Sequence, residues 1–222
     1  MTPLIIFGTG KIADCVAQYF ERSEDYELIG FTCDDDFVSR SHFRDRPVFP
    51  LSQLVNLYPP PEVQLFIALG YQGLNQLRQE RFEHVKSLGY RCAHLIVQGQ
   101  ENIQQIGENS IVMDQVAIQP EVKIGANVFI WGGAMIGHHA QIEDHAWITG
   151  SANIGGCVKI GSGSFIGLNA TIAQEVHIGE RCILGANTLT TSSLTDQAVK
   201  VSKETDLFRL NSSQFVRISS LF

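Results

Sequence analysis

The feature that most constrains this chain is a repeat of six residues that fills its second half. Every sixth residue from 106 to 184 is aliphatic, and the residue four places after each of them is small. In a chain that is 44% hydrophobic, fourteen such positions would all be hydrophobic by chance with a probability on the order of 10⁻⁵. The aliphatic positions are Ile106, Val112, Ile118, Ile124, Ile130, Ile136, Ile142, Ile148, Ile154, Ile160, Ile166, Ile172, Ile178 and Leu184.

A period of six fits neither an α-helix nor a simple alternating strand. It is the hexapeptide repeat of a parallel β-helix, in which each unit gives one short strand and one sharp turn. Three units make a triangular coil of 18 residues, with the aliphatic side chain inside, and coils stack at about the inter-strand spacing of ~4.8 Å. The sequence therefore predicts a parallel β-helix of four to five coils over residues 106–189.

Residues 1–97 have a different pattern, in which strands alternate with helices. The segments "LIIFGTGKIAD", "YELIGFTCDDD", "EVQLFIALG" and "YRCAHLIV" each contain one expected strand, and a long helical pattern follows the third. This alternation predicts a small Rossmann-like parallel α/β sheet of about four strands. We expect a linker at 98–105 and a C-terminal cap over the last coil at 190–222.

The first strand ends in a glycine turn that can hold a phosphate. Gly8, Thr9, Gly10 and Lys11 begin a G-x-G-x-x-A pattern, and three acids follow about 25 residues later, at Asp34, Asp35 and Asp36. This pattern is typical of dinucleotide sites, where helix amides face phosphate and an acid faces ribose. Because about four strands make only half of a dinucleotide domain, we favour a mononucleotide pocket. A plain strand-turn-helix corner is the alternative.

Composition excludes several other classes of protein. The net charge of −7 argues against nucleic-acid or anionic-membrane binding. Five cysteines are scattered without metal-ligand spacing, which favours reduced thiols and a cytoplasmic location. We find no signal-peptide pattern and no apolar run of 18 residues, so we expect no membrane insertion.

The two halves together resemble the bacterial sugar acetyltransferases of the PglD and NeuD type. The resemblance spans nearly the whole chain and is carried by "IIFGTGKIAD", "FTCDDD", "FIALGYQGLNQLR" and "IGHHAQIEDHAWITGSANIGGCVKIGSGSFIGLNATI". It implies a left-handed β-helix, a cytoplasmic homotrimer and no metal. It also implies transfer of an acetyl group from acetyl-CoA to an amino or hydroxyl group of a sugar. That sugar is often a nucleotide-linked 4-amino sugar for surface polysaccharide.

The resemblance places the catalytic histidine at His138, within Ile-Gly-His. Acyl transfer needs a general base and a donor for the thioester oxygen, and His138 is the natural base. The residue 18 later is Gly156, which should lie in the next coil and offer its amide near the imidazole. The resemblance assigns the acetyl-carbonyl contact to the same position. We expect acetyl-CoA along Gly155, Gly156 and the "IGLNATI" coil, with contacts from Gly167, Asn169 and Ala170.

Three positions depart from the pattern of the family. His139 stands where the family often has an acid, so we expect it to orient His138. An acid could come instead from Glu121, one coil below, or from a neighbouring chain. Trp131 and Trp147 replace polar positions, and Trp147 is in register with aromatic residues one coil away on either side. The pair either packs in a subunit seam or forms an altered acceptor or acyl pocket. The tail lacks the usual Pro-Ala-Lys segment, and its basic residues either reach CoA phosphates or are ordinary surface charges.

Two other functions compete with acetyl transfer. A zinc carbonic anhydrase uses the same trimeric helix and needs three histidines. His145 could join His138 or His139 as a ligand, but no histidine lies between His94 and His138 to supply the third. We otherwise expect His145 at a corner that faces solvent or a subunit seam. The second alternative is a non-catalytic scaffold with a nucleotide-sensing domain, which would not bind CoA.

Overall fold

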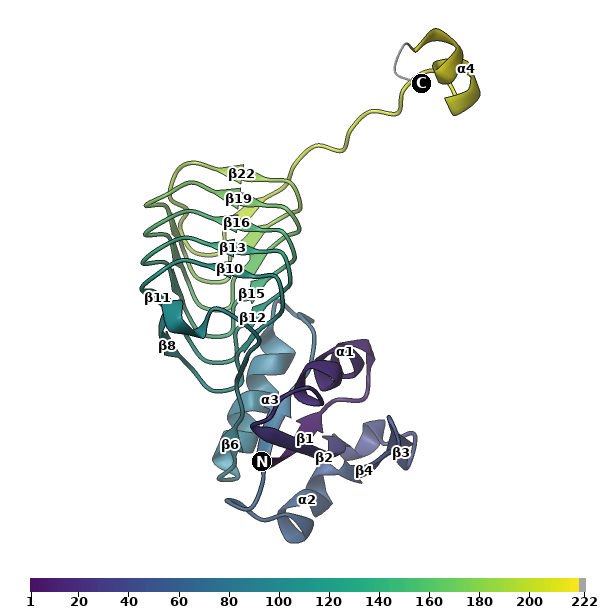
Figure 1. Ribbon diagram of the computed structural model, residues 1–222, viewed down its shortest axis with the longest axis vertical. Coiled ribbons are helices and arrows are strands. Elements are labelled where there is room, and N and C mark those ends of the chain that lie inside the picture. Colours follow the sequence, from purple (N-terminus) through teal and green to yellow (C-terminus); the bar gives the residue numbers. More distant parts are fainter. Residues whose placement is uncertain (220–222) are drawn as a thin grey trace.

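The computed structural model describes residues 1–219, which form an α/β domain followed by a parallel β-helix and an extended tail (Figure 1). The sheet of the first domain has the order β3-β4-β2-β1-β5-β6, and all of its pairs are parallel except β3 with β4. Its strands are β1 (Thr2–Phe7), β2 (Tyr26–Cys33), β3 (His42–Phe43), β4 (Arg46–Pro50), β5 (Gln64–Ile67) and β6 (Arg91–Cys92). Its helices are α1 (Lys11–Phe20), α2 (Leu51–Leu57) and α3 (Gln76–Ser87).

This sheet confirms the predicted α/β class, but the estimate of about four strands was too low. The short hairpin of β3 and β4, together with helix α2, was missed because "RPVFP" begins and ends near prolines and reads as a loop. In the folded chain Val48 of β4 pairs with Phe31 of β2, so β4 is a true parallel strand of the sheet. Strand β1 lies at the centre, and its Leu4, Ile5 and Ile6 are fully buried, as expected for a parallel strand covered on both faces.

The second half is the predicted parallel β-helix, built of three sheets. Neighbouring strands are 18 residues apart: Ile118 pairs with Ile136, Ile136 with Ile154, and Ile154 with Ile172. The three sheets run β10-β13-β16-β19-β22, β8-β11-β14-β17-β20, and β7-β9-β12-β15-β18-β21-β23. The aliphatic positions fill the interior, where Ile136, Ile154 and their equivalents are buried together with the small residues.

The β-helix strands are short, and most have two residues. They are β7 (Leu95–Ile96), β8 (Ile103–Ile106), β9 (Ile111–Val112), β10 (Ala117–Ile118), β11 (Val122–Ile124), β12 (Phe129–Ile130), β13 (Met135–Ile136), β14 (Gln141–Ile142), β15 (Trp147–Ile148), β16 (Asn153–Ile154), β17 (Lys159–Ile160), β18 (Phe165–Ile166), β19 (Thr171–Ile172), β20 (His177–Ile178), β21 (Ile183–Leu184), β22 (Leu189–Thr190) and β23 (Val199–Lys200). Strand β7 pairs with β9, so part of "YRCAHLIV" already belongs to the β-helix.

Each corner of the coil bends through one residue with positive φ, and these residues recur every six positions. Asn127, His139 and His145 are among them, with φ of 58°, 59° and 64°. Glycine supplies the same conformation at Gly133 and Gly163. Asparagine and glycine tolerate this left-handed region best, so the repeat carries its turn residues as well as its core residues.

The two domains are fixed to one another by Arg78 of α3, whose side chain is fully buried. Its guanidinium donates to the carbonyl oxygens of His145, at 2.7 Å, and Asn127, at 3.1 Å, and to the side-chain oxygens of Asn127 and Asn75. It also lies over the ring of Trp147, 5.0 Å from the centroid. Burial lowers the pKa of Arg78 to about 9, so the group stays protonated at neutral pH. Oxygen dipoles and ring faces therefore stabilise this buried cation.

The chain leaves the β-helix after β23. Residues 203–219 extend away from the last coil, and a short helix, α4 (Ser212–Ile218), stands clear of it (Figure 1). The side chain of Asn211 caps α4 by accepting from the amide of Gln214, and the side-chain oxygen of Gln214 accepts from the amide of Asn211. Ser202 still donates to the carbonyl of Ala186 in the last coil, at 2.7 Å, but residues 206–219 do not cover that coil. No helix in residues 1–219 is long and apolar enough to cross a membrane.

Candidate active site

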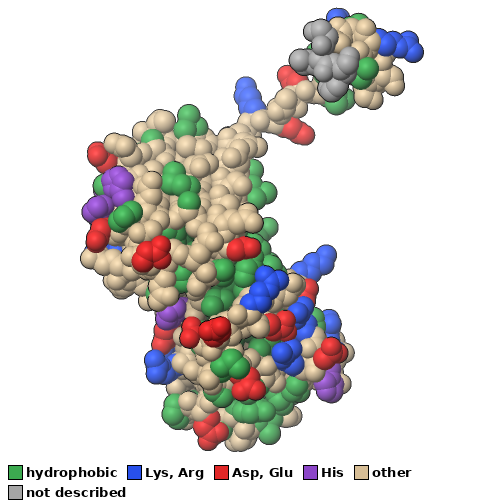
Figure 2. Space-filling view, in the orientation of Figure 1, with side chains coloured by type: hydrophobic (Ala, Val, Ile, Leu, Met, Phe, Trp, Pro, Cys, Tyr) green, Lys and Arg blue, Asp and Glu red, His purple; other side chains and the backbone are tan. Residues whose placement is uncertain are grey.

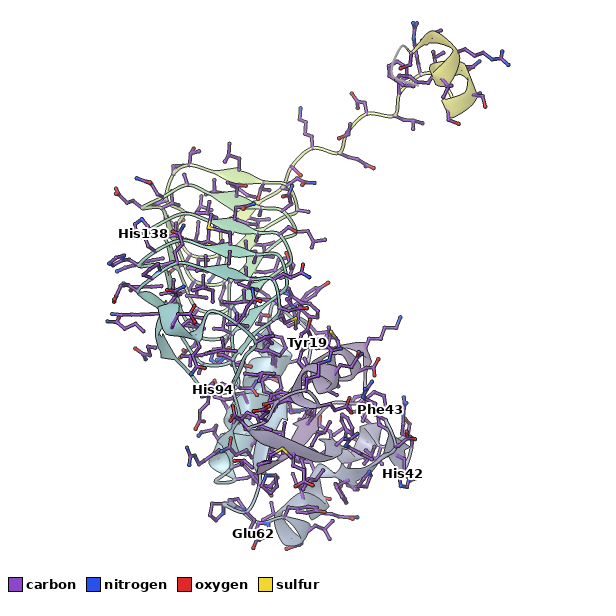
Figure 3. The ribbon with its side chains drawn as sticks, in the orientation of Figure 1. Tyr19, His42, Phe43, Glu62, His94 and His138 are labelled. Atoms are coloured by element: carbon purple, nitrogen blue, oxygen red, sulfur yellow. The ribbon has the colours of Figure 1, made fainter. Side chains whose placement is uncertain are left out.

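His138 lies just after β13, at a corner of the coil, with its ring exposed. Figure 3 shows it at the outer edge of the β-helix, away from the N-terminal domain. Its backbone amide donates to the side-chain oxygen of Gln119, at 2.9 Å, which ties the turn to the coil below. The imidazole lies against Gly156 of the next coil: a Cβ added to that glycine would be 2.6 Å from Nε2 of His138. Only a glycine leaves room for this ring, so the expected neighbours do meet.

The backbone carbonyl of Gly156 is hydrogen-bonded, whereas its backbone amide is open. Its carbonyl accepts from the amide of Glu175, at 2.8 Å. Its amide has no acceptor among residues 1–219, as is also true of the amides of Asp144, Ser162 and Gln174 at the same position of the repeat. The corresponding amides of His138 and Ala126 are taken by the side chains of Gln119 and Asp144. An N–H group is therefore open beside the imidazole, as an incoming carbonyl oxygen would require.

His139 contacts the catalytic candidate directly. The Nδ1 atoms of His138 and His139 are 3.2 Å apart, and the two rings are nearly perpendicular. A hydrogen bond between them needs a proton on only one of the two nitrogens. If His138 donates from Nδ1, its Nε2 carries a lone pair and is ready to accept a proton. In the described part of the chain Glu121 makes no hydrogen bond or ion pair with His139, so an imidazole takes the place of the expected acid.

The glycine turn of the N-terminal domain is open for a ligand. Gly8 has a φ of 124°, and a Cβ there would be 3.0 Å from the carbonyl oxygen of Ala68. Gly10 is exposed, begins α1 without a side-chain cap, and has open space around it. Thr9 is half-buried and Lys11 is exposed. The first amides of a ten-residue helix thus face an open side of the domain, which suits an anion.

The three acids beyond β2 lie at the same edge of the sheet, but two of them have partners within the chain. Asp34 forms an ion pair with Arg81 of α3, at 2.8 Å. Asp35 accepts from the amide and hydroxyl of Ser52, and these hydrogen bonds lower its pKa. Asp36 is exposed. Both partnered acids border a separate hollow of 310 Å³ between α2 and α3.

The glycines and small residues expected near CoA differ in their packing and exposure. Gly155 and Gly167 permit close stacking, because an added Cβ would be 2.5 Å from the amide of Gln174 and 2.6 Å from that of Ala186. Ala170 is buried in the core, so its side chain is not available to a ligand. Asn169 is an exposed corner residue whose amide group donates to the side chain of Asn187, at 2.8 Å.

The tryptophans lie at the junction of the two domains, close to the N-terminal domain. Trp147 is 2% exposed and stacks on Phe129, with centroids 4.9 Å apart and an interplanar angle of 9°. Tyr71, from the N-terminal domain, packs on Trp147 at 5.3 Å and on Phe165 at 4.9 Å. The register of the ladder was predicted correctly. The sequence did not predict that Tyr71, from the N-terminal domain, packs against this ladder.

A hollow of 460 Å³ opens beside this cluster, and we call it the aromatic pocket. Side chains from both domains form its walls, and they include Ile12, Tyr71, Trp131, Trp147, Phe165 and Leu168. Gly167 also lines it. Figure 2 shows hydrophobic side chains at this junction and along the adjoining edge of the β-helix, whereas histidines lie at the opposite edge. Tyr71, Leu168 and Ile12 were not singled out in the sequence, because nothing periodic marks them.

His145 is buried, which corrects its expected position at a solvent-facing corner or a subunit seam. Its ring contacts Phe82 of α3 at 6.0 Å between centroids, and its Nδ1 lies 2.9 Å from the amide nitrogen of Asn127. Burial lowers its pKa. Residues 1–219 contain no group of three or more His, Cys, Asp or Glu side chains placed to hold a metal ion.

Comparison with protein families identifies both parts of the chain. Residues 3–85 match the family profile of the PglD N-terminal domain. Residues 105–138 match the bacterial transferase hexapeptide, and residues 157–191 match the hexapeptide repeat of succinyl-transferase. The chain thus joins a PglD-type N-terminal domain to a hexapeptide β-helix. Among curated protein sequences, none matches the chain significantly.

Solved structures share the whole fold at low sequence identity. The acetyltransferase domain of PglB from Neisseria gonorrhoeae is 22% identical, with a TM-score of 0.76, over 90% of this chain and 96% of that one. A mutant of perosamine N-acetyltransferase from Caulobacter crescentus, in complex with CoA and GDP-perosamine, is 23% identical, with a TM-score of 0.78, over 90% and 93%. WeeI from Acinetobacter baumannii is 20% identical, with a TM-score of 0.74, over 91% and 97%.

Proposed function

We propose that this protein transfers an acetyl group from acetyl-CoA to an amino group of a nucleotide-linked sugar, with a hydroxyl group as the alternative acceptor. The observation that carries the proposal is the contact of the His138 imidazole with Gly156, whose amide is open. The related folds support it, because the PglB domain was also solved with acetyl coenzyme A and the perosamine enzyme with CoA and GDP-perosamine. The product would suit surface polysaccharide synthesis in the cytoplasm.

In this reaction His138 is the general base. Its Nε2 takes a proton from the attacking nitrogen as that nitrogen bonds to the thioester carbon. The carbonyl oxygen becomes an oxyanion that accepts a hydrogen bond from the amide of Gly156. The adduct then collapses, the carbon–sulfur bond breaks, and the CoA thiolate takes the proton from His138. While His138 is cationic, its Nδ1–H is donated to Nδ1 of His139, which orients the ring.

The nucleotide end of the acceptor would bind at the glycine turn. The free amides at the start of α1, together with Lys11, offer donors and positive charge to a phosphate. Thr9 and Gly10 lie in the same turn, and Asp36 is the acid that remains available for ribose or base. The negative net charge argues against nucleic acid as an alternative partner.

The proposed assembly is a homotrimer. The aromatic pocket and His138 lie at successive corners of the same coil, because Gly132 lines the pocket and His138 follows six residues later. One chain alone therefore does not place the two side by side. A second copy that presents its His138 corner to the pocket of the first would do so, which is why the proposal includes more than one chain.

The test is the release of CoA thiol from acetyl-CoA with a 4-amino nucleotide sugar. We expect His138→Ala to lose about 10²–10⁴ in kcat. His139→Ala should lose about tenfold if it orients the ring. His177→Ala is the matched control, since this exposed β20 histidine is not part of the proposed site. Normal turnover in His138→Ala would remove the base from the proposal, and no thiol release or CoA binding by the wild type would favour a scaffold.

A further inference from the structure

The tail, residues 203–219, exposes large apolar side chains that the two domains leave uncovered, because it stands clear of them (Figure 1). Leu207 is 99% exposed, Phe208 is 57% exposed, Val216 is 49% exposed and Ile218 is 68% exposed. Single apolar side chains are common on protein surfaces, but four large ones within twelve residues of sequence form a cluster. A cluster of this kind indicates a surface that is covered when its partner is present.

The apolar and polar side chains of the tail lie on different sides of its helix. The ring of Phe208 packs edge-on against that of Phe215, with centroids 5.3 Å apart, so the segment before α4 folds against the helix. Within α4, Phe215 and Ile218 lie on one side, whereas Ser213 and Arg217 lie on the opposite side. This separation suits a segment that lies in the boundary between water and an apolar phase.

The charge of the tail is opposite in sign to that of the rest of the molecule. Asp206 is the last of the 23 acids of the chain, and residues 207–222 carry Arg209 and Arg217 without any acid. The net charge of −7, which argues against binding to an anionic membrane, therefore describes the two domains and not this segment. The nine residues 203–211 can span up to ~30 Å, whereas the Debye length at physiological salt is about 8 Å. The acidic domains are thus screened from the two arginines.

We propose that the tail docks the protein on an anionic lipid surface. Phe208, Phe215 and Ile218 enter the boundary between the headgroups and the acyl chains, where their apolar surface leaves water. Arg209 and Arg217 remain at the level of the headgroups and pair with lipid phosphates. This docking is peripheral and needs no helix that spans the membrane. It goes beyond the proposed acetyl transfer and does not depend on it.

A lipid surface suits the tail better than a groove on another protein. A groove must match the shape of one tail and supply acids at fixed positions, whereas a lipid surface needs only apolar side chains and positive charge on an extended segment. In the proposed trimer, rotation about one axis places the three tails at the same height along that axis. One flat surface can therefore hold all three tails at once, and their combined binding is much tighter than that of one tail.

The first test is sedimentation of the full chain with vesicles of phosphatidylcholine, either alone or mixed with phosphatidylglycerol. We expect binding to the mixed, anionic vesicles, at least about tenfold weaker binding to the neutral ones, and a loss of binding as the NaCl concentration rises. Arg209→Gln combined with Arg217→Gln should weaken binding to anionic vesicles at least about tenfold. Arg22→Gln combined with Arg91→Gln is the matched control, because it removes two exposed charges from the N-terminal domain and should bind like the wild type.

The second test removes apolar surface from the tail and keeps its charge. Leu207→Ser combined with Ile218→Ser should weaken binding to the same vesicles at least about tenfold. Phe37→Ser combined with Leu57→Ser is the matched control, because both side chains are exposed on the N-terminal domain. On anionic vesicles, amide hydrogen exchange should slow within α4 and stay unchanged in the β-helix.

Several results would overturn the inference. One is no binding to anionic vesicles, and another is wild-type binding by the double arginine variant. A lower particle mass of the double serine variant Leu207→Ser and Ile218→Ser, measured without lipid, would assign the apolar side chains to a second copy of the chain. A higher KM for acetyl-CoA in the double arginine variant would assign Arg209 and Arg217 to CoA phosphates. Thiol release in solution tests the proposed function separately, and both tail variants should match the wild type in that assay.

Discussion

At the scale of single residues, the site depends on which side chains the coil places one above another. His138 and Gly156 are neighbours only because 18 residues separate them, and the glycine is required because the imidazole occupies the space of its Cβ. The ring of His139 contacts that of His138, with their Nδ1 atoms 3.2 Å apart. His145, six residues further along the chain, is buried against α3 and serves the domain junction.

Gly156→Ala should abolish most of the activity while the chain stays folded. The new Cβ would be 2.6 Å from Nε2 of His138, so the imidazole must rotate away from the open amide. A displacement of about 1 Å at a catalytic group can cost about 10²-fold in kcat. The measurement is kcat for acyl transfer beside the melting temperature, with Gln174→Ala as the control one coil further along. A fully active Gly156→Ala variant would contradict the packing described here.

His145 should make the protein less stable as the pH falls. Burial lowers its pKa in the folded chain, so the unfolded chain binds the proton first. Stability is therefore present above the unfolded pKa of about 6.5 and is lost as the pH falls toward the folded pKa. The melting temperature of the wild type should fall between pH 7 and pH 5, and that of His145→Gln should fall by about 2–4 °C less. His177→Gln, at an exposed site, should follow the wild type, and identical curves for all three would refute the argument.

At the scale of elements, α3 is the helix that joins the two domains. Its first residue is preceded by Asn75, which is buried and donates to the carbonyl of Gly163 in the β-helix. Arg78, one turn later, reaches two further corners of the β-helix through Asn127 and His145. The aromatic pocket depends on this junction, since Tyr71 comes from the segment just before α3.

Arg78→Lys should weaken the junction more than its conservative character suggests. Lysine keeps the charge but lacks the planar guanidinium group with its several N–H donors, so some of the buried oxygens lose their donor. We expect a loss of about 2–4 kcal/mol in the free energy of unfolding. Arg81→Lys, on the same helix with a partly exposed ion pair to Asp34, should cost about 1 kcal/mol or less. Urea unfolding followed by tryptophan fluorescence distinguishes the two variants. Equal losses in the free energy of unfolding would show that Arg78 does not stabilise the domain junction.

At the scale of the whole molecule, the pocket and the base lie at different corners, so the proposed reaction needs several copies of the chain. The exposed aliphatic side chains of the tail, such as Leu207 and Ile218, also lack cover within one chain. Light scattering should report about three times the chain mass of 24.6 kDa at micromolar concentration. A particle of one chain mass would contradict the shared site.

Mixed assemblies provide a sharper test of the shared site. His138→Ala lacks the base but keeps the pocket, and Leu168→Trp fills the pocket but keeps the base. If each site takes its base from one copy and its pocket from the next, randomly mixed trimers should recover about a quarter of the wild-type activity with acetyl-CoA. Each variant alone, and a mixture of two His138→Ala preparations, should stay inactive. A mixture no more active than its parts would place the base and the pocket within one chain.

The sequence by itself determined the β-helix, its 18-residue register and the meeting of His138 with Gly156. It could do so because every coil repeats the same hydrogen bonds and buries the same aliphatic position. The period of the sequence therefore shows which residues stack in neighbouring coils. The tertiary structure alone decided the rest: the parallel role of β4, the burial of His145, the junction through Arg78, and the pocket that Tyr71 closes beside Trp131 and Trp147. These contacts join segments far apart in the chain and do not repeat. No local pattern of hydrophobicity or charge could therefore indicate which side chains they bring together.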